Sequence, residues 1–178
     1  MNTLRTGMSL LVLAALAAAG CMLTSGQFVA NYNLPDPLHV VTAVTLPGVD
    51  VDFNTVSDYN DHKDDLKRVE DLALVGDIHN NLGTPANVDV WIVPAATLNL
   101  TPAQVQSQGV RLWGPLAVAG NSTERVDWDR SSALFVGRQA LIDEIKGDGH
   151  FSLYIIASGT YDVTVTDGTV IAVIGAAK

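Results

Sequence analysis

The sequence predicts a mainly β protein, an antiparallel β-sandwich of about seven to nine strands with one or two short crossover helices. Short segments in which apolar and polar residues alternate recur from residue 38 to the C-terminal end of the 178-residue chain. Pro, Gly and Asn gather between these segments, which is typical of turns. The length suits one hydrophobic core, so we expect a single domain over residues 38–178.

The first twenty residues have the composition of a secretory signal peptide. Arg5 precedes an apolar run from Met8 to Ala19, and small residues end the run. A basic start, a short apolar middle and a small-residue end are the three parts of such a signal. The run covers about a dozen residues, whereas a membrane-spanning helix needs about 20. We therefore expect residues 1–20 to be removed on export.

The segment Leu16-Ala17-Ala18-Ala19-Gly20-Cys21 resembles the lipobox of bacterial lipoproteins, although that family more often carries Leu at the position of Ala18. The resemblance implies that Cys21 is acylated and becomes the new N-terminus. Cys21 is also the single Cys of the chain, so an internal disulfide is excluded. Several acyl chains would hold the protein firmly to a membrane. An ordinary secreted protein cleaved near Ala19 is the alternative.

The predicted localisation and the net charge of the chain limit its possible partners. Met22 follows the cysteine where the lipoprotein family carries Asp for inner-membrane retention, so the resemblance implies the outer membrane, on its periplasmic face or at the cell surface, in a diderm organism. The chain has 19 acidic side chains and 10 Lys or Arg, of which Arg5 lies in the signal segment. This balance argues against nucleic acid and against electrostatic adhesion to anionic lipid. We expect the lipid to be the membrane contact.

The N-terminal part of the mature chain predicts a tether followed by strands. Residues 21–37 combine Ser, Gly, Asn and two Pro, which indicates a lipidated N-terminus on a flexible linker. Residues 38–46 are rich in β-branched side chains, and residues 49–53 alternate as a half-buried strand does. Residues 54–67 are strongly polar and are expected to contain a short helix. Two further alternating segments, 72–78 and 88–93, flank an Asn-rich loop and could pair as a hairpin.

The region 74–90 also bears a likeness to a known family. Leu74-Val75-Gly76-Asp77-Ile78-His79-Asn80-Asn81, then Pro85 and Val88-Asp89-Val90, is similar to the strand–Asn–Pro–strand pattern of LEA-2/WHy-type β-sandwiches. The likeness implies a β-sandwich, and we draw no function from it.

Helix signals follow in the second half of the chain. Thr101 and Gln104 have capping-box spacing, Pro102 suits the first turn, and Gly109 predicts the end of a short helix. Ser131 or Ser132 could cap a second helix. A third is expected over residues 139–146, before a terminating Gly147.

The C-terminal third predicts three strands. Residues 151–155 and 161–166 alternate, and residues 169–174 are nearly all apolar or β-branched. Asp167-Gly168 between the last two segments is typical of a two-residue type I′ hairpin turn. We therefore expect Thr166 to pair with Thr169.

The acidic segment is a candidate Ca²⁺ site. Its oxygen-bearing side chains have the spacing of a Ca²⁺-binding loop: Asp50, Asp52, Asn54, Asp58 and Asp61. Two features depart from that loop, because Thr55 replaces the turn Gly and Asp61 replaces a bidentate Glu. The alternative is a strand with a solvated acidic face followed by a polar loop.

The sequence contains no strong catalytic or zinc motif. The four His residues lack local metal-site spacing, so zinc would need distant ligands such as His62, His79 and Asp61. The chain has no G-x-S-x-G and no Gly-rich phosphate loop. No catalytic residue and no cofactor other than possible Ca²⁺ is predicted.

Two aromatic residues are candidates for ligand binding. Trp91 and Tyr154 both fall on the polar phase of their strands, so they could form an exposed platform for a sugar or peptide, or else fill the rim of the core. The leading hypothesis is a lipid-anchored, non-catalytic domain that binds or scaffolds another envelope component. A Ca²⁺-dependent or carbohydrate-binding surface module and a hydrolase with an unfamiliar site are the alternatives.

Overall fold

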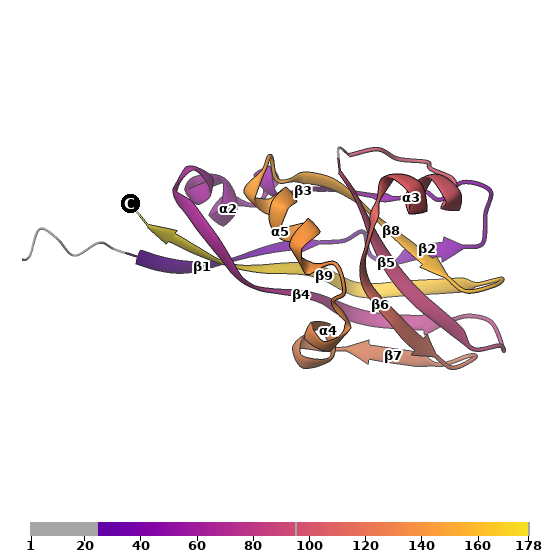
Figure 1. The fold of residues 1–178 in the computed structure, drawn as a ribbon. Helices are drawn as coiled ribbons and strands as arrows, with labels where there is room; N and C mark the ends of the chain where they lie inside the picture. Colours follow the sequence, from indigo (N-terminus) through magenta and orange to yellow (C-terminus); the bar gives the residue numbers. More distant parts are fainter. Residues whose placement is uncertain (1–24, 95, 178) are drawn as a thin grey trace, which may run out of the picture.

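A computed structural model of the chain describes residues 25–94 and 96–177. These residues form two antiparallel sheets that pack face to face with helices along their margins, which confirms the predicted β-sandwich class (Figure 1). The five-stranded sheet contains β1 (Ser25–Asn33), β2 (Leu38–Val41), β4 (Leu66–Asn80), β7 (Thr123–Val126) and β9 (Asp162–Ala177). The four-stranded sheet contains β3 (Val49–Asp52), β5 (Ala86–Pro94), β6 (Val110–Val118) and β8 (His150–Ala157).

Strand β9 organises the five-stranded sheet. The strand order is β1-β9-β4-β7, and β2 pairs with the same edge of β9 as β1 but further toward its N-terminal end. The four-stranded sheet has the order β3-β8-β5-β6. Neighbouring strands in both sheets are antiparallel, as is common in sheets that pack one face on a shared core.

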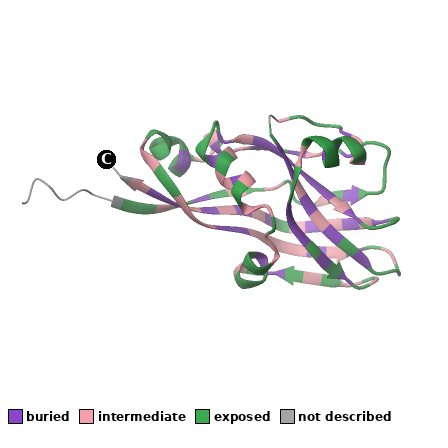
Figure 2. Ribbon diagram, in the orientation of Figure 1, coloured by how far each residue is buried: buried purple, intermediate pink, exposed green. Residues whose placement is uncertain are grey.

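The core lies between the sheets and forms one continuous cluster of buried side chains. Val163, Ala172 and Ile174 of β9 and Phe151 of β8 belong to this cluster, and each of these four is fully buried. Figure 2 shows the same alternation of buried and less buried positions along the central strands. Full burial of an aliphatic or Phe side chain stabilises a fold by roughly 1.5–3 kcal/mol, so this cluster is the main source of stability.

The predicted hairpin at Asp167-Gly168 is wrong. Strand β9 runs straight through both residues for 16 positions, and Asp167 has a φ of 54° inside a β-bulge against β4. Gly76, opposite on β4, has a φ of 147°. The two halves of β9 do not pair with each other because β4 is long enough to pair with both. The left-handed conformation that Asp favours is used here for a bulge rather than for a turn.

The predicted pairing of residues 72–78 with residues 88–93 is also wrong, because β4 and β5 belong to different sheets. The loop between them crosses from one sheet to the other. Asn80 fixes this crossing: it is fully buried, its Nδ2 donates to the carbonyl of Thr84, and its Oδ1 accepts from the N–H of Leu82. Nδ2 also lies within hydrogen-bond distance of two carbonyl oxygens, those of Val118 and Ala119.

Residues 25–33 form β1 instead of part of a flexible tether. The strand pairs with β9 over its whole length, and Ala30 is fully buried. Tyr32 reaches across to the other sheet, where its hydroxyl donates to the carbonyl of Asp50 at 2.8 Å. Phe28, Ala30 and Tyr32 recur at every second position, a strand signal that the exposed Val29 and the surrounding Asn, Gly and Pro obscured.

The described residues contain four short α-helices: α2 (Ser57–His62), α3 (Pro102–Gln108), α4 (Trp128–Leu134) and α5 (Arg138–Lys146), with 3₁₀ turns η1 (Phe53–Thr55) and η2 (Lys63–Asp65). The fold prediction has only one or two crossover helices, although each of the four helices lies in or beside a segment with a helix signal. The capping box of Thr101 and Gln104 and the end of α5 at Gly147 are confirmed. The cap of α4 is Asp127 rather than a Ser, because Ser131 lies inside the helix, fully buried, and accepts a hydrogen bond from the N–H of Leu74.

Candidate functional site

The acidic residues of the predicted Ca²⁺ loop have other partners. Asp52 caps η1, since its Oδ1 accepts from the backbone N–H of Asn54 at 2.9 Å and from the side-chain amide of Asn54 at 2.8 Å. Asp50 lies 2.8 Å from Nε2 of His150 on the neighbouring strand. Hydrogen bonds within the protein thus account for the first three candidate ligands.

The last two candidates lie on a helix. Asp58 and Asp61 belong to α2, so the chain turns helical where a Ca²⁺ loop would wrap around the ion. Among residues 25–94 and 96–177, no group of three or more His, Cys, Asp or Glu side chains could hold a metal ion. The five candidates therefore do not form such a group in this structure.

The histidines are spread over the surface. His62 stacks on Phe28, and His79 shares a hydrogen bond with Thr123 at 2.9 Å. His62 precedes β4 and His79 nearly ends it, and a strand of 15 residues is about 50 Å long. The zinc set of His62, His79 and Asp61 is therefore not assembled.

The outer face of the five-stranded sheet carries a polar cluster at the end away from Ser25. Asp162 Oδ1 lies 2.7 Å from His39 Nε2 and accepts from Asn81 Nδ2 at 2.6 Å. Asn81 also donates to the hydroxyl of Thr164 at 3.0 Å, and His79 pairs with Thr164 across β4 and β9. The hydrogen bond from His39, together with that from Asn81, lowers the pKa of Asp162. We call His39, His79, Asn81, Asp162 and Thr164 the distal polar cluster.

The cluster contains one of two exposed His–Asp pairs in the described chain. His39 and His150 are more than a third exposed, and neither pair lines one of the cavities described for this fold. The pair of His39 and Asp162 joins β2 to β9, and Asn81 joins the end of β4 to both. These contacts hold three strand ends together.

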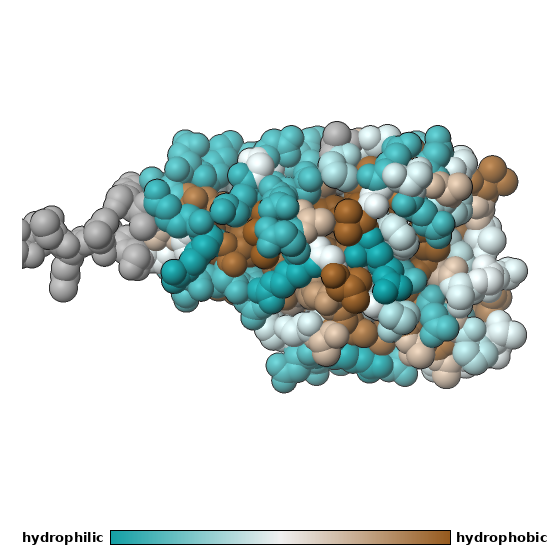
Figure 3. Space-filling model, viewed as in Figure 1, coloured by the Kyte–Doolittle hydropathy of each residue, from teal (hydrophilic) through white to brown (hydrophobic). Residues whose placement is uncertain are grey.

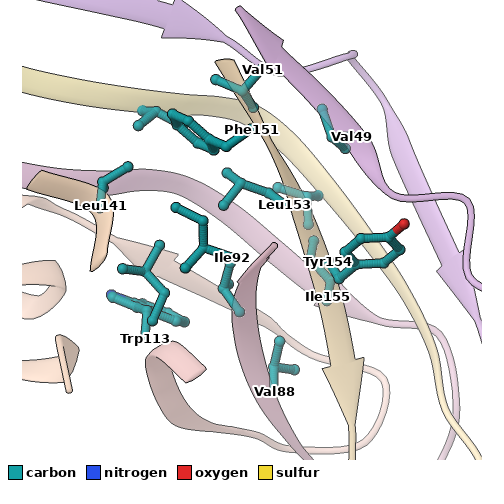
Figure 4. Packing of buried hydrophobic residues seen from close by; sticks show 14 of the residues in the cluster. Val49, Val51, Val88, Ile92, Trp113, Leu141, Phe151, Leu153, Tyr154 and Ile155 are labelled. Atoms are coloured by element: carbon teal, nitrogen blue, oxygen red, sulfur yellow. The ribbon is translucent and has the colours of Figure 1, made fainter. Parts of the chain in front are cut away.

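The structure places the two aromatic candidates in different surroundings. Tyr154 is wrong as an exposed residue: it is only 1 % exposed, and its hydroxyl donates to the carbonyl of Thr97 at 2.6 Å. Figure 4 shows its ring on the opposite side of β8 from Phe151 and Leu153. The predicted phase is therefore right, but a segment containing Thr97 covers this face. Trp91, which pairs with Tyr154 across β5 and β8, is half-buried.

Trp91 has a charged pair beside it. Arg111 pairs with Trp91 across β5 and β6, and its Nη1 lies 3.8 Å from Oδ1 of Asp89. That oxygen is buried and has no hydrogen-bond partner within the protein. We call Asp89, Trp91 and Arg111 the Trp91 face. A ring beside an acceptor and a guanidinium can stack on an apolar surface of a ligand while binding its hydroxyl groups.

Gly114 leaves the space that the side chain of Asp89 occupies. A Cβ atom on Gly114 would come within 2.7 Å of Oδ1 of Asp89 and 2.6 Å of the carbonyl oxygen of Val88. Burial raises the pKa of Asp89, and the positive charge of Arg111 opposes this only in part. Sequence reasoning missed both Asp89 and Arg111 as site residues. Asp89 shares the strand phase of Trp91, which was the available signal, but the bulged register of β5 and β6 hid Arg111.

The space-filling view in Figure 3 shows one face of the molecule, on which hydrophilic and apolar side chains are mixed. No helix in the described part of the chain has the length and apolar character needed to cross a membrane. Cys21, the predicted lipidation site, lies outside the described residues. Comparisons with protein-family models, with curated proteins and with solved structures give no match.

Proposed function

We propose that the protein is a lipid-anchored envelope lipoprotein whose β-sandwich is a non-catalytic binding or scaffolding domain. The signal-like residues 1–20 and the lipobox-like residues before Cys21 support export and acylation. The observation that carries the proposal is the position of β1. This strand begins at Ser25, so three residues separate Cys21 from the first strand of the sheet.

The short spacing gives the domain an orientation. Four residue steps reach at most about 14 Å, so Ser25 would lie close to the lipid. β1 and the end of β9 project together at one end of the molecule (Figure 1). The loop after Asn80 lies at the other end of β4, about 50 Å along the strand. The membrane would thus meet one end of the sandwich, and the distal polar cluster would face outward toward a partner.

The titratable groups on the surface take part in contacts between strands, which fits a binding or scaffolding domain. Asp162 is bound by both His39 and Asn81, and His150 binds Asp50. Each of these pairs ties two elements together on an open surface. Met22 after the lipidated residue favours the outer membrane where the organism has one.

Mass spectrometry of the protein purified from membranes tests the anchor. The expected N-terminal peptide begins at Cys21 and carries acyl chains, and Cys21→Ala should release the protein into the soluble fraction. Ser25→Ala is the matched control and should stay in the membrane fraction. An N-terminus without lipid, or membrane retention of Cys21→Ala, would contradict the anchor.

A pull-down from membranes tests the binding role. The chain with Cys21 intact should retain a defined envelope component, and Asn81→Ala combined with Thr164→Ala, which alters the distal polar cluster, should reduce that yield severalfold. Reproducible turnover of a substrate, lost in a single point variant, would contradict a non-catalytic role.

Saccharide binding is a second candidate, favoured by the Trp91 face. Trp91 offers a half-buried ring next to Asp89 and Arg111, the combination that suits a sugar ring and its hydroxyl groups. Binding of envelope glycan fragments should quench or shift Trp fluorescence. Trp91→Ala should abolish binding, whereas Trp128→Ala, at a half-buried Trp of α4, should preserve it. Equal binding by both variants would exclude this face.

A further inference from the structure

A cavity of about 50 Å³ lies between the two sheets, at the level where β4 and β9 bulge. Ile78 and Val165 contribute to the wall on the five-stranded side. Val49, Val90 and Leu153 contribute on the four-stranded side, and Val49 and Leu153 can be located in Figure 4. The bulge is the structural reason for the space, because two strands that curve locally cannot keep their inner side chains in full contact with the opposite sheet.

The cavity lacks the polar groups that would bind a water molecule. Its wall contains no charged side chain, and its polar side-chain groups are the hydroxyl of Thr169 and the indole N–H of Trp113, which already donates to the carbonyl of Ser131. Within the described residues, the buried side-chain atoms that lack a hydrogen-bond partner are Asp89 Oδ1 and Ser152 Oγ, and neither residue lines the cavity. A buried water needs two to four polar partners, so an apolar occupant suits this space better than water.

The cavity has half-buried residues at its rim. Leu34 and Leu38 flank the break between β1 and β2, where the edge of the five-stranded sheet is interrupted. Leu34 covers the bulge, since its side chain lies within 3.1 Å of the position that a Cβ on Gly168 would take. Leu74, Val75 and Thr169 of the rim are also half-buried. Movement of one leucine side chain at this break would open a path from solvent.

We propose that this cavity binds the end of an unbranched alkyl chain. A water molecule occupies about 10–15 Å³ on this measure, so a space of about 50 Å³ accommodates roughly four groups of that size. A cavity that holds benzene is about three times larger, so an aromatic ring is too bulky. A hydrocarbon chain that enters beside Leu34 would leave its polar head in solvent. The proposal is independent of the acylation of Cys21.

Methyl NMR of the full chain in a fluorinated surfactant, whose tails do not compete as hydrocarbon, tests the proposal. Titration with hexan-1-ol should shift the methyl signals of Val90 and Val165 in a saturable manner and leave that of Val51, which does not line the cavity, unchanged. Benzene at the same concentration should give no saturable shift. Absence of saturable shifts with hexan-1-ol, or equal binding of benzene, would overturn the proposal.

Two cavity-filling variants supply the second measurement. Val90→Ile and Val165→Ile each add one methylene to the wall and should weaken hexan-1-ol binding at least about tenfold, a typical effect of one methylene in an apolar pocket. Val88→Ile, at a buried position outside the wall, is the matched control and should leave affinity unchanged. Unchanged affinity in both filling variants would overturn the assignment of the cavity.

Two compounds with the same alkyl chain on different polar groups test where the bound alkyl chain comes from. Sodium hexanoate and monomeric dihexanoyl phosphatidylcholine should shift the same methyl signals with affinities within about tenfold of each other, because the cavity wall contacts only hydrocarbon. Binding of one compound alone would overturn recognition through the chain end.

Discussion

The outer faces of the two sheets differ in what lies on them. Asp162, Thr164 and Thr166 project from the outer face of the five-stranded sheet and remain half-exposed. On the four-stranded sheet, Ser152 and Tyr154 point outward in the same way, yet both are buried. The difference shows that the direction of a side chain on a strand and its burial are set by separate features of the sequence.

A second apolar layer causes this difference. Leu46 and Leu100 form a bridge outside the four-stranded sheet, and both are buried. Val105 of α3 is fully buried, and Gly109 packs so closely that a Cβ would lie 2.9 Å from a methyl group of Val93. The segment from residue 96 to residue 109 therefore converts a solvated face into an interior one.

The largest expected effect comes from removing the ring that this layer covers. Tyr154→Ala should lower the free energy of unfolding by about 3–4 kcal/mol, because it leaves a cavity and removes the hydrogen bond from the Tyr154 hydroxyl to the carbonyl of Thr97. Thr164→Ala, at the equivalent outward phase of the bare face, should cost less than about 1 kcal/mol. Urea denaturation measures both changes. Similar losses of stability in the two variants would show that the covering layer does not increase the contribution of the side chains beneath it.

The crossing between the sheets should come next in size. Asn80→Ala should destabilise the fold by about 2–3 kcal/mol, because buried carbonyl groups lose their donor and the N–H of Leu82 loses its acceptor. Asn81→Ala is the exposed control and should cost less than about 1 kcal/mol. A loss below about 1 kcal/mol for Asn80→Ala would show that solvent can replace this network.

The sequence predicted local features well and long-range ones poorly. The capping box at Thr101 and the helix stop at Gly147 were predictable because their partners lie within four residues. The assignment of β4 and β5 to different sheets was not, since it depends on which strands β9 can pair with along 16 residues. Asp167-Gly168 favours a left-handed residue, and that preference serves a bulge as readily as a turn.

The candidate sites show the same difference between local features, which the sequence predicts, and long-range features, which it does not. Strand phase placed Trp91 and Tyr154 on one face, which is correct. Their different burial depends on the covering segment, and the neighbourhood of Asp89 and Arg111 depends on a bulged register between β5 and β6. Neither arrangement leaves a periodic trace in the sequence.

The covering layer depends in part on the start of α3. Thr101→Ala removes a side chain that accepts from the N–H of Gln104 and should lower the free energy of unfolding by about 1 kcal/mol. Gln106→Ala, an exposed change in the middle of the same helix, should cost less than about 0.5 kcal/mol. Hydrogen exchange should show faster opening of residues 102–108 in Thr101→Ala. Unchanged exchange in these residues would show that the helix cap does not stabilise the covering layer.

The smallest expected effects concern how the free energy of unfolding depends on pH, and they differ in sign between the Trp91 face and the distal polar cluster. Asp89 has a raised pKa in the folded protein because burial disfavours its charge, so its favourable contribution is present below the unfolded value of about 3.9 and is lost as pH rises through the folded pKa. Asp89→Asn should therefore raise the free energy of unfolding at pH 7, by less than about 1 kcal/mol, and the gain should disappear near pH 3.

Asp162 should show the opposite sign. Its folded pKa is lowered by the hydrogen bonds from His39 and Asn81, so its contribution is present above the unfolded value and is lost as pH falls through the folded pKa. Asp162→Asn should destabilise the protein at pH 7, and the loss should shrink only in strongly acidic solution. Urea denaturation of both variants across pH 3–7 measures this contrast. If the two variants changed stability in the same direction at pH 7, charge burial would not be what separates the Trp91 face from the distal polar cluster.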